Sequence, residues 1–273
     1  MGIGKAYLVK NKQICYAKYV SLVFDHSQSF EYIMRNMSHF IRDSDMSLQD
    51  FKKICDRQTD IKNYPLAASV DKNIVIYKGD FLNQKFSFKD EIIEILLNGP
   101  GIFVVRNFYQ DVSIVDNMSK VFDQILKNES NGKGDHFGDS TVKNANSRIW
   151  DSFTKAAVVS PSTFTAYFSN PLLKIISESW LGPGFQMTSQ VNIVHPKGKS
   201  QISHRDYHLG FQNLEVLYEM PLHVHDLSSK LTLQGAIAHT DIPIESGSTK
   251  LLPFSQHFRA VSKRILLLIS VVF

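Results

Sequence analysis

A histidine and a carboxylate with the spacing of a β-strand lie in the stretch Ser203-His204-Arg205-Asp206. Side chains of a strand alternate between its two faces, so His204 and Asp206 are predicted to project from one face, within reach of a single ion. An imidazole and a carboxylate begin the facial triad that binds non-haem iron(II) and leaves coordination positions open. Binding of 2-oxoglutarate and O2 would require such open positions. On its own the pair is weak evidence, because a surface strand with two polar residues has the same spacing.

A second group of histidines, His223-Val-His225, begins like the signature of the metallo-hydrolases. The later ligands of that signature are missing, so this stretch is predicted to be a polar loop or part of the approach to a pocket. A cupin-like metal-binding protein that uses His204, His223 and His225 remains an alternative to an iron site formed with His204 and Asp206.

Two further positions could contribute polar groups to a site. His208 shares a face with His204 and Asp206 if their strand continues, and His239 with Asp241 forms another His-x-Asp pair. The second pair lies where a strand is predicted to enter a turn. The chain has no phosphate-binding Walker loop, no G-x-S-x-G elbow and no dinucleotide-binding fingerprint, so those enzyme classes are not indicated.

The elements around these residues follow from hydrophobic periodicity. Helices are predicted at residues 30–41, 48–55, 90–97, 112–126, 161–170 and 172–180, and strands at 73–77, 101–106, 186–194, 201–209, 230–239 and 251–252. Gly99-Pro100-Gly101 should end the third helix, and the polar, Gly-rich residues 127–146 predict a loop. Helices followed by successive strands indicate an α+β chain whose second half is an antiparallel barrel or sandwich.

Taken in order, these stretches resemble the phytanoyl-CoA dioxygenase (PhyH) family of Fe(II)/2-oxoglutarate-dependent oxygenases. The similar segments are an entry strand at 101–108, a hairpin from 187 to 206, and a strand, turn and strand at 231–256. The resemblance covers about residues 95–257 and implies a double-stranded β-helix, or jelly roll, with flanking helices. It divides the chain into a helical or irregular N-terminal extension at 1–90 and an oxygenase domain at 91–273.

The resemblance also implies roles for individual residues. His204 and Asp206 match the first two iron ligands, and Gln190, Asn192 and Gln234 match positions that contact 2-oxoglutarate. A polar side chain on such a strand could equally well hydrogen-bond a neighbouring loop. The implied reaction hydroxylates a small-molecule or lipid-like substrate with O2 and releases succinate and CO2.

The C-terminal stretch departs from the family pattern. The family places a third ligand, a His, and a 2-oxoglutarate-binding Arg well after a turn that corresponds to residues 253–256. Here His257 and Arg264 follow that turn too closely, so His257 is a weak candidate ligand and is predicted to be a surface turn residue. The apolar run 265–273 could form a strand, but nothing follows to pair with it. The oxygenase domain is therefore expected to be truncated and its jelly roll incomplete, and a catalytically inactive family member is the second alternative.

Composition limits the partners and the compartment. The chain has 30 basic and 26 acidic residues, a net charge of +4, and no run of Lys and Arg dense enough to predict nucleic-acid binding. No segment has the length and apolarity of a membrane span. Cys15 and Cys55 fit no metal-binding spacing, and so few thiols favour a reducing compartment such as the cytoplasm.

Overall fold

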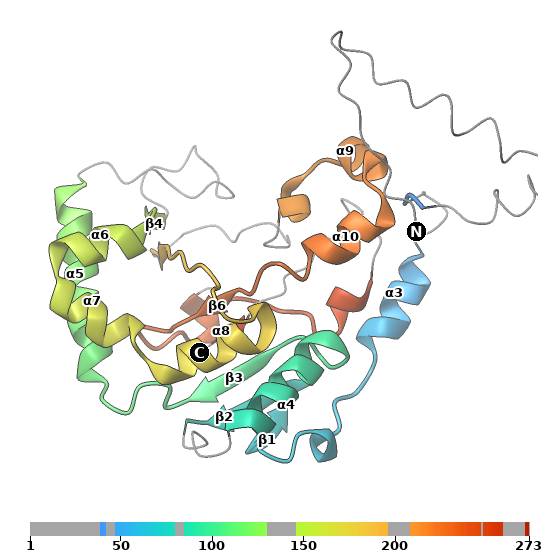
Figure 1. Cartoon of the computed structure of the whole chain (residues 1–273), viewed down its shortest axis with the longest axis horizontal. Coiled ribbons are helices and arrows are strands. Elements are labelled where there is room, and N and C mark those ends of the chain that lie inside the picture. The colour runs from blue at the N-terminus through green and yellow to red at the C-terminus, as the bar shows by residue number, and fades with distance from the viewer. Residues whose placement is uncertain are drawn as a thin grey trace, which may run out of the picture. The chain divides into compact units, whose positions relative to one another are not determined.

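The computed structural model describes residues 39–41, 47–79, 85–129, 146–195, 208–246, 248–258 and 271–272 (Figure 1). The chain divides into two units, Met1–His39 and Phe40–Phe273, and the fold that follows is that of the second unit. His204 and Asp206 lie outside the described residues, as does most of the predicted helix at 30–41.

Helices and short strands alternate along the described part of the chain. The α-helices are α3 (Leu48–Cys55), α4 (Lys85–Leu97), α5 (Ser113–Asn128), α6 (Ser152–Val159), α7 (Pro161–Phe168), α8 (Pro171–Leu181), α9 (Leu214–Glu219) and α10 (Leu222–Ser228). The strands are β1 (Ser69–Asp71), β2 (Ile74–Lys78), β3 (Phe103–Arg106), β4 (Asn146–Ile149), β5 (Val191–Val194), β6 (Gly235–Ala236) and β7 (Val271–Val272). Short 3-10 helices occur at η2 (Ile61–Asn63), η4 (His208–Phe211), η5 (Ile244–Ser246) and η6 (Ser255–His257).

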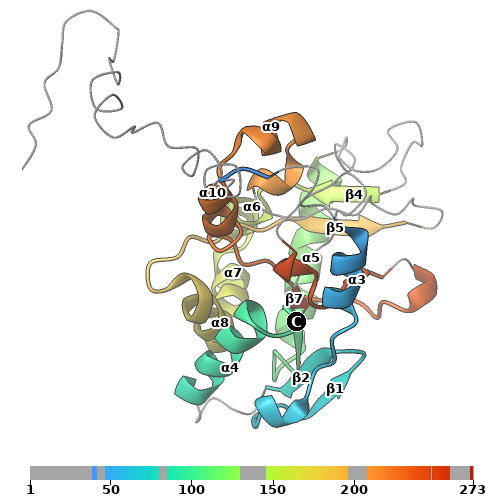
Figure 2. The same ribbon diagram turned by 90° about the vertical axis from the view of Figure 1, so that its right-hand side faces the viewer.

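The described strands form two small sheets. One has the order β1-β2-β3-β7-β6, with β1 antiparallel to β2 and the remaining pairs parallel. The other is the antiparallel pair β4-β5, whose strand β4 lies beside α5 (Figure 2). The mixture of helices and sheets confirms the predicted α+β class, while the double-stranded β-helix is not confirmed. The domain boundary between residues 90 and 91 stays a prediction.

Local signals placed several helices correctly. The predicted helix at 48–55 is α3, where the Ser47 side chain accepts a hydrogen bond from the backbone N–H of Asp50 and so caps the first turn. Pro161 occupies the first turn of α7 and Pro171 the first turn of α8, positions where proline costs no helical hydrogen bond. The stop at Gly99-Pro100-Gly101 is also confirmed, because α4 ends at Leu97.

Several predictions in the C-terminal third were wrong. Of the strand predicted at 230–239 the structure forms only β6, and residues 251–252 are not in a strand. The polar loop predicted at His223-Val-His225 is the helix α10. The apolar C-terminal run does have partners, since β7 pairs with β3 on one side and with β6 on the other. Alternation of apolar residues predicts that a strand can form, but not whether a partner lies beside it.

The core lies where α4 to α8 pack together and against the larger sheet. The side chains of Tyr77, Phe88 and Phe103 are fully buried, and the Tyr77 ring contacts the other two edge to face. Val191 of β5 and both flanks of β6, Leu233 and Ile237, pack on this same core. Segments that are distant in the sequence and bear predicted site residues are therefore supported by a common hydrophobic surface.

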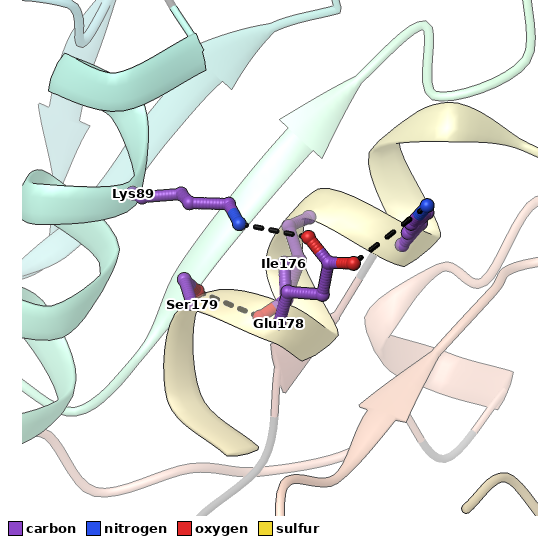
Figure 3. Close-up of polar contacts among 5 residues, drawn as sticks. Lys89, Ile176, Glu178 and Ser179 are labelled. Carbon is purple, nitrogen blue, oxygen red and sulfur yellow. Dashed lines mark hydrogen bonds and ion pairs between the residues drawn. The ribbon is translucent and has the colours of Figure 1, made fainter. Parts of the chain in front are cut away.

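An ion pair fastens α4 to α8. Lys89 Nζ lies 2.8 Å from Glu178 Oε2 (Figure 3). Lys174 Nζ lies 3.7 Å from Glu178 Oε1. The Lys89 and Glu178 side chains are about four-fifths buried, with exposures of 22% and 18%. The pair therefore links the two helices through a largely buried, charge-assisted hydrogen bond.

Glu91 of α4 is a buried acidic residue, with an exposed fraction of 8%. It accepts hydrogen bonds from the Leu66 N–H at 2.9 Å and from the Tyr77 hydroxyl at 2.7 Å. Glu91→Gln is expected to lower the free energy of unfolding by about 1–3 kcal/mol. The glutamine side chain has an NH2 group in place of one carboxylate oxygen, so one of the two donors loses its acceptor. Chemical denaturation measures this change. Glu94→Gln, at an exposed position of the same helix, is the control, and an equal loss in both variants would contradict the prediction.

Candidate functional site

The two faces of the β4-β5 sheet differ in character. Ile149 is paired with Val191, and these side chains pack into or against the core. Arg148 is paired with Asn192. Directly opposed residues of an antiparallel pair project from the same face, so Arg148 and Asn192 point away from the core together.

On this outward side a cation–π pair lies beside amide side chains. The Arg148 guanidinium carbon lies 4.7 Å from the centre of the Trp150 ring. Gln190 and Asn192, two positions apart, are both exposed. We call Arg148, Trp150, Gln190 and Asn192 the polar face. It offers a fixed positive charge and amide donors, which are the groups that recognise a carboxylate.

Arg148 was not singled out from the sequence. One Arg in the short strand NSRI has no distinguishing motif, and its importance depends on its register opposite Asn192. A one-residue shift of that register would have turned Arg148 toward the core. The pairing of β4 with β5 is therefore the observation that brings Arg148 to the predicted cosubstrate residues.

The third predicted cosubstrate residue, Gln234, belongs to neither strand of the β4-β5 pair. It is half-buried and directly precedes β6, which belongs to the larger sheet. Its neighbour Leu233 and the β5 residue Val191 pack on the same core cluster. The structure thus groups Gln190 with Asn192, and places Gln234 directly before β6, in a segment that packs on the same core.

The segment that carries His204 and Asp206 is bounded by described residues on both sides. It leaves β5 through His195, whose Nε2 lies 2.7 Å from Ser147 Oγ of β4. The described chain resumes at His208 in η4. The strand predicted at 201–209 therefore does not extend to His208 and Leu209, and the condition under which His208 would share a face with His204 is not met.

The histidines of α10 diverge. His225 is 5% exposed and its Nε2 donates to the backbone oxygen of Leu217 at 3.0 Å, whereas His223 is exposed. Residues two apart on an α-helix point about 200° apart around its axis. His223 and His225 therefore do not face one ion, which counts against the cupin-like alternative.

His257 closes the turn between α4 and β3. Its Nε2 lies 2.9 Å from the backbone oxygen of Gly99, and Gln256 Nε2 donates to the same oxygen at 2.8 Å. Gly101 has a φ of +76°, and a Cβ there would meet the Gln256 side chain at 2.5 Å. A carbonyl oxygen only accepts hydrogen bonds, so Nε2 of His257 carries the proton and only Nδ1 retains a lone pair for a metal.

Among the residues that the structure describes, no three His, Cys, Asp or Glu side chains come together in a way that could hold a metal ion. Nor does this part of the chain contain a helix long and apolar enough to cross a membrane.

Comparison with known families assigns the chain to a class. The profile of the phytanoyl-CoA dioxygenase (PhyH) family matches residues 97–264, more than half of the sequence, and the chain belongs to this family. Members are generally Fe(II)- and 2-oxoglutarate-dependent oxygenases. No curated protein and no solved structure gave a match. The matched region includes the polar face and the segment with His204 and Asp206.

Proposed function

We propose that the protein is an Fe(II)/2-oxoglutarate-dependent dioxygenase that hydroxylates a small-molecule or lipid-like substrate and releases succinate and CO2. The family match over residues 97–264 is the observation that carries this proposal. The polar face adds support, because it gathers a cation and two amides at the strand pair from which the segment with the His-x-Asp pair leaves.

His204 and Asp206 would supply an imidazole and a carboxylate, a donor set that suits iron(II) in the family to which the chain belongs. When bound, the iron with 2-oxoglutarate and O2 supplies the oxidising power for C–H hydroxylation. The chain's part is to orient the cosubstrate and the substrate and to keep water out. His257, through Nδ1, is a weak candidate for the third donor.

The polar face would hold the distal carboxylate of 2-oxoglutarate. A guanidinium matches a carboxylate with two parallel N–H groups. Its stacking on Trp150 restricts the Arg148 side chain before binding, so less conformational freedom is lost when the carboxylate binds. Gln190 and Asn192 would add amide donors from the same side. Gln234 would contact the cosubstrate from its position directly before β6.

Anaerobic titration of the full chain with Fe(II) and 2-oxoglutarate tests the proposal. Chelation of 2-oxoglutarate to protein-bound iron is expected to produce a visible metal-to-ligand charge-transfer band, and exposure to O2 should then yield succinate. Absence of both the band and succinate in the wild-type protein would reject the proposed activity and favour an inactive family member.

Arg148→Met is expected to weaken 2-oxoglutarate binding about 10- to 100-fold, because a charge-assisted hydrogen bond contributes roughly 1.5–3 kcal/mol. The apparent dissociation constant from the same titration measures this loss. Arg148→Lys should recover only part of the affinity, since an ammonium cannot form the two parallel bonds. Arg106→Met, which removes an exposed cation at the end of β3, is the matched control. Equal affinities for the two Met variants would remove Arg148 from the site.

A further inference from the structure

A polar cluster around His239 joins the 231–241 segment to α5 and α7. His239 Nδ1 lies 2.8 Å from Ser119 Oγ of α5, and His239 Nε2 lies 2.7 Å from the Tyr167 hydroxyl of α7. The imidazole also contacts the rings of Phe122 and Tyr167, with centroids 5.5 and 5.6 Å away. Both ring nitrogens thus have partners, and these come from two different helices.

The hydrogen bonds of the partners determine the tautomer of His239. Ser119 donates its hydroxyl proton to the Val115 backbone oxygen at 3.0 Å, so its oxygen is left to accept from His239 Nδ1–H. A neutral imidazole then presents a lone pair at Nε2, which accepts from the Tyr167 hydroxyl. The cluster is fully paired when His239 is neutral. A proton on Nε2 would require the Tyr167 hydroxyl to turn and accept, so that its own proton would need another acceptor.

The segment that His239 anchors also pairs with β7 through a short strand. Its strand β6 is two residues long, and both Gly235 and Ala236 are exposed. Leu233 and Ile237 supply partly buried apolar contacts with the core. Apolar contacts are not directional, whereas two hydrogen bonds at fixed angles define where the segment lies along α5 and α7.

We propose that His239 is a positioning residue that holds the 231–241 segment, and with it Gln234, in place for 2-oxoglutarate binding only while its imidazole is neutral. The consequence for the cosubstrate rests on the proposed function. The anchoring of the segment does not, because it follows from contacts among Ser119, Tyr167 and His239.

The surroundings favour the neutral form. Burial lowers the pKa of His239, while the carboxylate of Asp116 on α5 opposes this shift. From α7, burial raises the pKa of Tyr167, and the nearby Tyr109 raises it further, so that hydroxyl stays protonated and able to donate. The unfolded chain therefore binds a proton at His239 more readily than the folded chain. Anchoring is complete above the ordinary histidine pKa and is lost as the pH falls through the lowered value.

Hydrogen exchange of the metal-free protein tests the anchoring directly. Protection factors for amides of the 231–241 segment should fall about tenfold as the pH drops below the His239 pKa, the effect of losing one buried hydrogen bond. Tyr167→Phe should show the reduced protection already at neutral pH. His239→Gln, which does not titrate and keeps an acceptor for Tyr167, should remove the pH step. His223→Gln, at an exposed histidine, should behave like the wild type.

The 2-oxoglutarate affinity of the iron-loaded protein should show the same pH step, and His239→Gln should abolish it. Unchanged protection in both Tyr167→Phe and His239→Gln would overturn the proposal, as would a pH step that survives His239→Gln. If the wild-type protein forms no complex with iron and 2-oxoglutarate, the proposed function fails. The exchange measurement then still decides whether His239 anchors the segment.

Discussion

Replacing His204 by alanine is expected to abolish the charge-transfer band and the formation of succinate. An imidazole that ligates the metal cannot be replaced by a methyl group, and loss of even an outer-shell partner typically costs about 10- to 100-fold in metal affinity or activity. The loss on removing a direct ligand should exceed that range. Anaerobic titration with Fe(II) and 2-oxoglutarate, followed by succinate analysis, measures both effects.

Asp206→Ala should give the same loss, since the carboxylate supplies the second ligand from the same predicted strand face. His223→Ala is the matched histidine control, because His223 is exposed on α10. It also tests the cupin-like alternative, in which His223 would be a ligand. A band that survives His204→Ala, or disappears in His223→Ala, would overturn the ligand assignment.

Phe88→Ala is expected to produce the largest loss of stability. Phe88 of α4 is fully buried, and its ring contacts the Tyr77 ring edge to face at a centroid distance of 5.1 Å. Truncating a buried phenylalanine typically costs about 3–5 kcal/mol, because it removes apolar burial and leaves a cavity. That loss is a large fraction of the total stability of an ordinary domain. Chemical denaturation monitored by circular dichroism measures it.

Phe86, two residues earlier on α4, provides the internal control. Its side chain is 81% exposed, so Phe86→Ala removes almost no buried surface and should change the free energy of unfolding by about 0.5 kcal/mol or less. Both substitutions change helix propensity equally, and their difference therefore isolates burial. Similar losses in the two variants would show that the packing of α4 on the sheet is not as described.

The sequence alone determined the family and the α+β class. The order of the loose motifs from the entry strand at 101–108 to the turn at 253–256 predicted the PhyH family, and the profile match confirms it. Helix starts were also predictable, because capping by Ser47 and the first-turn position of Pro161 depend on residues only a few positions away. The assignment of His204 and Asp206 to iron stays a prediction.

The tertiary structure decided which residues meet. Arg148 faces Asn192 only because β4 pairs with β5 in one particular register, and no local pattern specifies that register. His239 was noticed as part of a His-x-Asp pair, yet its partners Ser119 and Tyr167 lie 120 and 72 residues away in the sequence. Likewise, the spacing of His223 and His225 suggested a metal site, but in the helix α10 the two side chains point to different sides. Periodicity reports which face of an element is apolar, whereas contacts between elements depend on how those faces pack together.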